Sequence, residues 1–503
     1  MITLAGPADL TREAVEAVAW GGERLALAPA VLERVAAGQA ELAALLAGGA
    51  RVYGVNTGMG WLASVDLDPA AQAGHQRNLL LGRAVAGPPW LPAAEARALL
   101  VTRLANLVSG HAGVGPELCR FLVDRIDDGF VPAVPRRGFG GAGEVIPLAH
   151  AFQTLTGAGL VLEDGGTADA GRALAERGVL PYRLQAKEGI ALLAGSPLAA
   201  ALALARLRAG ERLAGQLLAS AAAAVDALGA PLDAYDEAVG RLAGDPLLEE
   251  VLADLRRATG RRTAPVLQAP VSFRVAPQVL AQLRRTLGRL DEDVRRALSA
   301  VTDSPALVDG RVVAGGGFHA VGLAAAMDGL AVALVQAAEL AGQRLHRLLD
   351  GRFSGLADQL SPDPGPVTGL VLVQKRAVGA LAEARRLAAP AAVGLADTSL
   401  GQEDAASFAP EAAEQLRRVE ELVREVVACE LLAARQAWWL RAARRDPGPA
   451  RRDTGRPGGP APGLAGLAGC LEELVAPVER DRPLGPDLAR LVEALEGDEL
   501  PLP

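Results

Sequence analysis

Four glycines within six positions, Gly138, Gly140, Gly141 and Gly143, run directly into an apolar segment that begins at Val145. Glycine adopts left-handed and tightly folded backbone without steric cost, so such a run lets the main chain approach another group closely. N–H groups left free at the start of the helix that we expect next would favour an anion or a developing negative charge. This stretch is therefore the first candidate for a chemical site.

The same glycines also fit a dinucleotide-binding pattern, G-x-G-x-x-G, with Glu163 twenty residues after Gly143. That pattern requires a buried parallel strand immediately before the glycines. The preceding residues, Val131–Arg137, include two prolines and two arginines, which make a poor central strand. We therefore reject nucleotide binding.

Long helical patterns must position the glycine loop. An amphipathic helix is expected near residues 30–47, because Pro29 suits its start and Gly48-Gly49 its end. Helical patterns also cover 93–127, 197–228, 278–301, 318–350, 368–389 and 410–445. Several of these tracts exceed twenty-five residues, which is typical of a helical bundle rather than of a compact α/β domain. The sequence predicts a mainly α fold.

We divide the chain into three parts on the basis of these patterns. Residues 1–195 form an N-terminal region of helices and loops, and residues 196–445 form a central bundle of long helices. Residues 446–503 form a linker and a helical tail at about 467–498, because 444–466 is rich in arginine, proline and glycine.

Composition limits the classes of partner. Half of the 503 residues are apolar, only 3% are aromatic, and the net charge is −8 with the arginines scattered among acidic residues. This distribution argues against a standing nucleic-acid partner. Charged residues interrupt the apolar tract 197–228, so an ordinary membrane-spanning helix is not expected there.

The remaining composition points to a soluble, cytoplasmic protein without a metal. Three cysteines, Cys119, Cys429 and Cys470, are far apart and odd in number, which fits a reducing compartment. The N-terminal residues show no signal-peptide pattern. The five histidines form no close pair with metal-ligand spacing, so we expect no metal site.

The glycine stretch resembles the cofactor loop of the histidine and aromatic amino-acid ammonia-lyases, whose pattern is roughly G-S-V-G-A-S-G-D-L-A-P-L-A-H. Aligned on Pro147–His150, Glu144 takes the place of the family's aspartate and His150 that of its histidine. In that family Ala-Ser-Gly cyclises and dehydrates into 4-methylidene-imidazol-5-one, an electrophile. Here the three positions read Gly141-Ala142-Gly143, and alanine has no hydroxyl to lose. The resemblance implies a fumarase/aspartase-like helical bundle whose loop is degenerate, and we expect no cofactor.

The stretch Tyr53-Gly-Val-Asn-Thr-Gly-Met-Gly60 resembles the family's mobile loop, which carries the catalytic base. A phenol ordinarily titrates near pH ~10, so it acts as a base only where positive charge lies nearby. Glycines at 54, 58 and 60 would let the loop open and close over a ligand. The alternative is a tyrosine packed beside a turn.

A second stretch, Gln76–Arg83, resembles the family segment whose last two residues face the substrate side chain. Within this stretch we also expect Asn78 to contact the substrate. These last residues are Gly82 and Arg83, which match none of the family's patterns for histidine, tyrosine or phenylalanine. Glycine leaves space, and an arginine there suits an anionic or strongly accepting group. The alternative is an ion pair between Arg83 and a protein carboxylate.

Five further stretches match the family in order. Residues 107–114 match a structural turn that contains His111, and residues 187–196 match K-E-G-L-A-L-x-N-G-T with Ala194 at the asparagine. Residues 268–278 keep Gln268 and Arg274, and the resemblance implies that this arginine pairs with the substrate carboxylate.

Residues 314–319 keep Phe318 of the family's S-G-G-N-F-H but have Gly317 at its asparagine. Residues 398–404 match T-S-x-x-Q-E-D, which implies a site carboxylate at Glu403 with Gln402 beside it. A glutamate in a bundle core is costly without a cationic partner or ligand. The alternative is an exposed glutamate at a helix start.

The positions that differ from the family pattern have other roles than the positions that match it. Positions linked to the family's electrophile are lost: Ala142, Ala194, Val271 and Gly317. Positions that would bind a carboxylate or move a proton are kept: Tyr53, Arg274 and Glu403. This division favours a repurposed enzyme in which Tyr53 and Glu403 are catalytic. Its carboxylate-bearing substrate would need an activated C–H bond or a Michael acceptor, and elimination, isomerisation or cyclisation would suit.

Two alternatives stay open. One is a catalytically inactive homologue that binds a ligand or associates with an active relative. The other is a chain in which residues 141–143 still cyclise and leave a ring without the methylidene, at the loss of one water. The family resemblance further implies a homotetramer whose active sites draw residues from more than one subunit.

Overall fold

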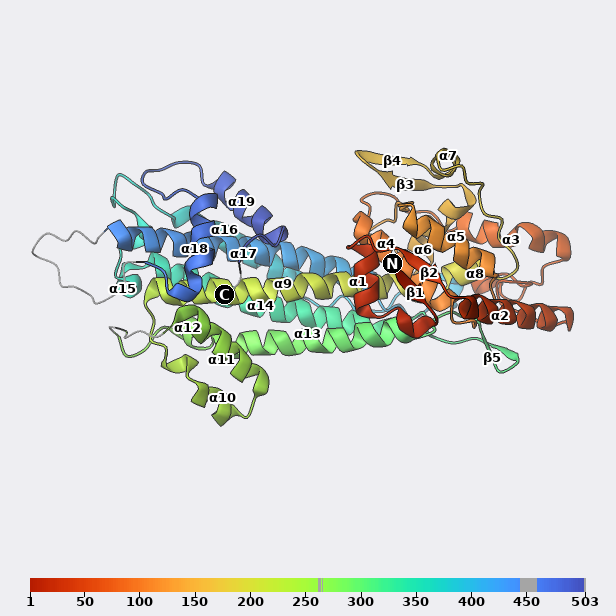
Figure 1. Ribbon diagram of the computed structural model, residues 1–503, viewed down its shortest axis with the longest axis horizontal. Helices are drawn as coiled ribbons and strands as arrows, with labels where there is room; N and C mark the ends of the chain where they lie inside the picture. The colour runs from red at the N-terminus through yellow and green to blue at the C-terminus, as the bar shows by residue number, and fades with distance from the viewer. Residues whose placement is uncertain (261–263, 265, 444–458, 502–503) are drawn as a thin grey trace, which may run out of the picture. The chain divides into compact units, whose positions relative to one another are not determined.

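Helices make up most of the chain, and within the described residues the strands form only two-stranded sheets. The computed structural model describes residues 1–260, 264, 266–443 and 459–501. The chain forms two units, each assembled from segments that are far apart in the sequence. The first unit comprises residues 1–206, 290–327 and 390–414, and the second comprises residues 207–289, 328–389 and 415–503. Figure 1 labels the elements of both units.

The first unit contains eight short or medium helices in the N-terminal part of the chain. They are α1 (Arg12–Ala19), α2 (Pro29–Ala47), α3 (Pro69–Leu81), α4 (Ala93–Leu107), α5 (Pro116–Asp127), α6 (Val145–Gln153), α7 (Ala170–Glu176) and α8 (Glu188–Leu193). Its strands are β1 (Ile2–Leu4), β2 (Leu25–Leu27), β3 (Leu160–Glu163), β4 (Gly166–Asp169), β5 (Ala306–Val308) and β6 (Arg311–Val313). The 3-10 helices η2 (Gly60–Leu62) and η6 (Ser399–Gly401) belong to loops.

Four long helices contribute residues to both units, and their bounds agree with the predicted tracts to within three residues. They are α9 (Pro197–Leu228), α13 (Ala276–Ser299), α14 (Val321–Leu349) and α17 (Ala409–Ala443). The second unit adds α10 (Glu237–Ala243), α11 (Pro246–Thr259), α12 (Val271–Arg274), α15 (Gly351–Ser354), α16 (Val371–Leu387), α18 (Ala465–Leu474) and α19 (Gly485–Glu496). The predicted mainly helical bundle is confirmed.

Two predicted helical tracts were wrong in extent. The pattern over 93–127 is interrupted between α4 and α5, where Gly110 and Gly113 have φ of 85° and 66°. Left-handed backbone ends a helix, and Pro116 then suits the first position of α5. The tail at 467–498 is likewise two helices, α18 and α19, because three prolines fall between residues 477 and 486.

The boundaries that we drew at residues 195 and 445 followed the order of the sequence, whereas the units are discontinuous. The segments 290–327 and 390–414 belong to the same unit as the N-terminal residues. Most of the expected linker, residues 444–458, lies outside the described residues. The first unit therefore gathers the glycine loop, the Tyr53 loop and the segment that contains Glu403.

Close packing of small residues joins the helices within the second unit. A Cβ added at Gly210 of α9 would lie 2.8 Å from Leu287 of α13 and 3.1 Å from Leu330 of α14. Arg344 of α14 and Glu430 of α17 form a buried bidentate ion pair at 2.7 and 2.9 Å. Interiors this dense leave no room for larger side chains at such positions.

Two apolar stretches are long enough to cross a membrane by length and composition alone. They are Glu188–Leu228, whose apolar window is entirely buried in the protein, and Val321–Leu349, whose window is 61% buried. Burial of this kind is what a core helix requires, since its apolar surface is covered by protein.

A tight hairpin closes the β5–β6 pair in the first unit. Asp309 and Gly310 both have positive φ, 49° and 75°, as a two-residue hairpin turn demands. The hairpin is fastened to the turn after α4, where Leu307 N donates to the His111 carbonyl at 2.8 Å. The His111 ring nitrogen Nδ1 lies 2.7 Å from the Leu307 carbonyl oxygen. His111 thus has the structural surroundings that its motif predicted.

Candidate active site

The Tyr53 loop is a compact turn structure between α2 and α3. The phenol oxygen of Tyr53 accepts a hydrogen bond of 2.7 Å from the main-chain N–H of Gly60. Asn56 ties the loop to its own start, because its side chain accepts from Val52 N at 2.7 Å and donates to Ala50 O at 2.8 Å. Gly54 and Gly60 have φ of 69° and 68°, which favours glycine at both positions. The half-buried phenol is therefore held at one end of a glycine-hinged loop.

Arg83 follows α3 and interacts electrostatically with both Tyr53 and Glu403. Burial lowers the pKa of the Arg83 guanidinium, and these two groups oppose that shift. The Arg83 guanidinium donates a hydrogen bond to the Leu79 carbonyl at 3.2 Å. Among the described residues no carboxylate oxygen lies within 4.0 Å of Arg83, so the alternative of a protein ion pair is not observed.

Glu403 lies beside the glycine loop. Its Oε2 accepts hydrogen bonds from the Ala142 N–H at 3.4 Å and from the Thr398 hydroxyl at 3.2 Å. The turn before it is strained, because Ser399 and Leu400 have φ of 53° and 56° although neither is glycine. The residue is half-buried and precedes α17 by six positions, so it is not an exposed glutamate at a helix start.

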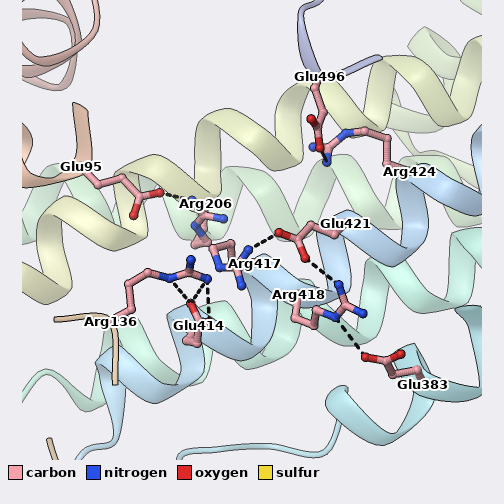
Figure 2. A network of polar contacts seen from close by, with 10 residues as sticks. All are labelled: Glu95, Arg136, Arg206, Glu383, Glu414, Arg417, Arg418, Glu421, Arg424 and Glu496. Atoms are coloured by element: carbon pink, nitrogen blue, oxygen red, sulfur yellow. Dashed lines mark hydrogen bonds and ion pairs between the residues drawn. The ribbon is translucent and has the colours of Figure 1, made fainter. Parts of the chain in front are cut away.

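Acidic side chains hold the glycine loop at several points. Arg136, just before the loop, pairs with Glu414 of α17 at 2.8 Å, as Figure 2 shows. Within the loop, Gly140 N donates to Glu411 at 3.4 Å. Figure 2 also shows the ion pair between Arg206 and Glu95, which joins α9 to α4 in the same unit. The loop is therefore anchored to the first turns of α17.

Glu144 ends the loop and caps the start of helix α9. Its two carboxyl oxygens accept from Leu198 N and Ala199 N, each at 2.7 Å, at the start of α9. The carboxyl group is fully buried, and burial raises its pKa to about 8 despite these hydrogen bonds and the attraction of Arg103. The position of the family's aspartate thus has a clear structural task in this chain: it satisfies N–H groups that a helix start leaves unpaired.

The first two residues of the K-E-G motif, Lys187 and Glu188, make buried polar contacts in the first unit. Lys187 pairs with Asp303 at 2.7 Å, and both side chains are essentially excluded from solvent. Glu188 accepts from Gly115 N at 3.1 Å and from Gln185 N at 2.7 Å. Lys187 and Glu188 have partners inside the protein, as buried charges require, whereas Oδ1 of Asp303 has none among the described residues.

Phe318 packs on the loop, and the carbonyls of two positions that depart from the family pattern, Gly317 and Ala194, accept hydrogen bonds. A Cβ added at Gly143 would lie 3.7 Å from Phe318, so that aromatic ring packs on the end of the loop. Gly317 O accepts from the Ser196 hydroxyl at 3.1 Å. Ala194 O accepts a hydrogen bond from the fully buried Arg103. The carbonyl of Ala194 therefore has a structural partner, although the family's amide side chain is missing.

Two histidines close to the site were not predicted to contribute to it. His150 Nε2 accepts the Ala86 N–H at 3.1 Å, next to the Arg83 segment, and burial lowers the pKa of this imidazole. Burial, followed by the charge of Arg83, lowers the pKa of His75, and its Nε2 is sealed without a partner among the described residues. Residues 75, 79 and 83 are spaced four apart, a spacing that places side chains on one face of a helix. The sequence alone could therefore have associated His75 with Arg83.

The structure brings together only part of the predicted site. Tyr53, Arg83, Glu403, the loop 141–143 and Phe318 share the first unit. The other first-unit predictions are exposed to solvent: Asn78, Gly82 and Gln402. Gln268 and Arg274 belong to the second unit, where Gln268 is exposed and Arg274 is half-buried at the end of α12. The Nε of Arg274 is sealed and has no partner among the described residues.

The chain combines long helices with a tyrosine on a glycine-rich loop. An arginine interacts electrostatically with this tyrosine and with a carboxylate that contacts a second glycine loop. These features define a class of lyase. The model of the aromatic amino acid lyase family matches residues 10–455. The chain therefore belongs to this family.

Relatives and solved structures agree over nearly the whole chain. The histidine ammonia-lyase of Symbiobacterium thermophilum is 34% identical over 502 residues, covering 98% of this chain and 96% of that protein. The histidine ammonia-lyase of Anaeromyxobacter sp. strain K is 36% identical, with 95% of each chain covered. The tyrosine aminomutase of Streptomyces globisporus has a TM-score of 0.90 and 26% identity, covering 99% of this chain and 97% of that one.

Proposed function

We propose that the protein is a member of the aromatic amino acid lyase family that works without the methylidene-imidazolone group and uses Tyr53 as its base. The observation that carries this proposal is that main-chain N–H groups hold both groups in place: Gly60 N donates to the Tyr53 phenol, and Ala142 N, on the loop that lacks the family's serine, donates to Glu403. Arg83 interacts electrostatically with both Tyr53 and Glu403. The proton-transfer groups therefore have a supporting environment that does not depend on the electrophile.

The loop residues do not fit the prosthetic group of the family. Ala142 has a methyl group where dehydration would need a hydroxyl, and its N–H donates to Glu403. The asparagine that accompanies the group in the family is replaced by Ala194. We therefore derive no step through that electrophile, and ordinary deamination of histidine, phenylalanine or tyrosine is not expected.

In the proposed reaction, the Tyr53 phenolate removes a proton from a carbon that is already acidified by a carbonyl or lies next to a Michael acceptor. Glu403 then gives a proton to a departing group, or returns one to another carbon in an isomerisation. The electron pair of the broken C–H bond forms the new double bond, so no oxidant is needed. Arg83 attracts an anionic or strongly accepting part of the substrate, and we assign the substrate carboxylate to Arg274 on the strength of the family motif.

The class of substrate follows from these charges. We infer a small carboxylate, amino-acid-derived compounds included, that has a second anionic or accepting group, because Arg83 occupies the position that faces the substrate side chain in the family. The proposal includes a cytoplasmic homotetramer that takes no nucleic acid or membrane as partner. A catalytically inactive homologue, acting as a binding or partner protein, is the second candidate, and the replacements at Ala194, Val271 and Gly317 favour it.

Solvent-deuterium exchange into a panel of small mono- and dicarboxylates tests the proposal. We expect exchange at one carbon with the natural protein and its loss in Tyr53→Phe. Tyr182→Phe is the matched control, because Tyr182 donates to Glu188 at 3.2 Å outside the site. Binding without exchange would favour the inactive homologue, and formation of urocanate, cinnamate or coumarate would overturn the proposal. Intact mass should equal the sequence mass, whereas loss of one water would indicate cyclisation of residues 141–143.

A further inference from the structure

The buried side chain of Gln76 bridges two segments that are distant in the sequence. Its Nε2 donates to the Gly54 carbonyl at 2.9 Å, and its Oε1 accepts from the Ile190 N–H at 3.1 Å. Only 5% of the residue is exposed. A primary amide provides a donor and an acceptor in one planar group, which matches a carbonyl on one side and an N–H on the other.

Each of these partners would otherwise be unsatisfied by regular structure. Ile190 lies at the third position of α8, where an N–H has no acceptor within its own helix. The carbonyl of Gly54 belongs to a turn and adjoins Tyr53. A buried donor or acceptor without a partner is costly, so this amide, together with the His75 ring that also hydrogen-bonds to the Gly54 main chain, has a large effect on the geometry at both ends.

Steric contacts hold the same three residues together. A Cβ added at Gly54 would lie 3.1 Å from the Ile190 side chain, so that side chain covers the loop residue directly. A Cβ added at Gly189 would lie 2.2 Å from the Gln76 carbonyl oxygen, which shows that α8 and α3 approach at backbone distance. Gly54, Gln76 and Ile190 are therefore packed as well as hydrogen-bonded, and the glycines at 54 and 189 permit it.

We propose that Gln76 is the positioning residue of the Tyr53 loop, tying Gly54 to the start of α8 so that the phenol is presented in one place. Its amide links the K-E-G segment, anchored by the Lys187–Asp303 pair, to the residue that follows Tyr53. The role in catalysis rests on the proposed function of Tyr53. The role in positioning does not, because it can be measured without any substrate.

Amide hydrogen exchange of the protein is the direct test. Gly60 N donates to the Tyr53 phenol, so protection of the Gly60 amide reports whether the phenol is in place. Gln76→Glu keeps the size and an acceptor for Ile190 N but removes the donor to Gly54 O. We expect about five- to tenfold faster exchange at Gly60 and across residues 53–60, from the loss of one hydrogen bond.

The matched control is Gln72→Glu, which makes the same change one turn earlier on α3. Gln72 donates to the Leu67 carbonyl at 2.7 Å, so a side chain-to-backbone hydrogen bond is also lost there. We expect its exchange over 53–60 to equal that of the natural protein. Gln76→Asn serves as a neutral second variant, because its shorter side chain cannot reach both partners.

Natural protection of residues 53–60 in folded Gln76→Glu and Gln76→Asn would overturn the proposal. Collapse of the whole unit in both variants, without selective loss over 53–60, would also count against it, since Gln76 would then serve the fold at large. If substrate turnover is found, kcat should fall about tenfold with KM nearly unchanged in Gln76→Asn. Faster loop exchange without any turnover in the natural protein would retain the positioning role and reject only the proposed enzyme.

Discussion

The main-chain N–H of Ala142 points to Oε2 of Glu403 at 3.4 Å. The residue that replaces the family's serine is thus in contact with a carboxylate that the family motif retains. The same oxygen also accepts from the Thr398 hydroxyl, so it has two neutral donors in addition to the electrostatic attraction of Arg83. This arrangement keeps an acidic group beside the loop in which Ala142 stands at the position of the family's serine.

Replacement of Glu403 should separate two proton transfers. If Glu403 protonates the departing group while Tyr53 removes the first proton, Glu403→Gln should lower product formation about 10²-fold and leave deuterium exchange. NMR of the substrate measures both rates in one sample. Glu411→Gln, which alters the contact to Gly140 N on the same loop, is the control and should retain both rates. Equal loss of exchange and product formation in Glu403→Gln would contradict separate roles.

Arg83 should determine which carboxylates bind. We expect Arg83→Gln to weaken binding of dicarboxylates about tenfold, because one charge-assisted hydrogen bond contributes roughly 1.5–3 kcal/mol, while monocarboxylates change little. Isothermal titration calorimetry with paired mono- and dicarboxylates gives the comparison. Arg77→Gln removes an exposed charge from α3, the helix that precedes Arg83, and should leave both affinities intact. Equal weakening of both ligand classes would show that Arg83 does not face the second anionic group.

Ionisation of the buried Glu144 carboxyl group should destabilise the first unit as pH rises. Its folded pKa of about 8 lies above its ordinary value of 4.5, so the folded state binds the extra proton between these values. The stability from this group is fully present below pH 4.5 and is lost as pH rises through about 8. We expect the unfolding free energy to fall as pH rises from about 4.5 to about 8 and to level off above that. Glu144→Gln, an isostere of the protonated side chain, should flatten that dependence in urea titrations; an unchanged slope would refute the assignment.

Removing one member of the buried Lys187–Asp303 pair should be costly. Lys187→Met leaves the Asp303 carboxylate without its cation in a site that is 1% exposed, and one of its oxygens, Oδ1, has no partner even in the intact pair. We expect a loss of about 3–5 kcal/mol in unfolding free energy. The double variant Lys187→Met/Asp303→Asn removes both charges and should recover most of it. A double variant as unstable as the single one would show that packing, rather than the unpaired charge, is responsible.

The helices of this protein could be predicted because their signals are local. Pro197 and the continuous small apolar residues after it place the start of α9, and Pro29 with Gly48 delimits α2. The prediction of one continuous helix over 93–127 failed at Gly110 and Gly113. The helical spacing continues across these residues in the sequence, but their left-handed backbone ends α4. Local pattern therefore predicts where a helix is stable but not every point at which tertiary packing interrupts it.

The sequence by itself determined the family motifs, the absence of a hydroxyl at Ala142 and the identity of the retained residues Tyr53, Arg83 and Glu403. Only the tertiary structure decided what these residues meet. The interaction of Arg83 with Glu403, the capping of α9 by Glu144 and the bridge from Gln76 to Gly54 each join residues dozens to hundreds of positions apart. Such contacts have no period or local composition, because they form where separate segments fold against one another, and burial then fixes which donors and acceptors must pair.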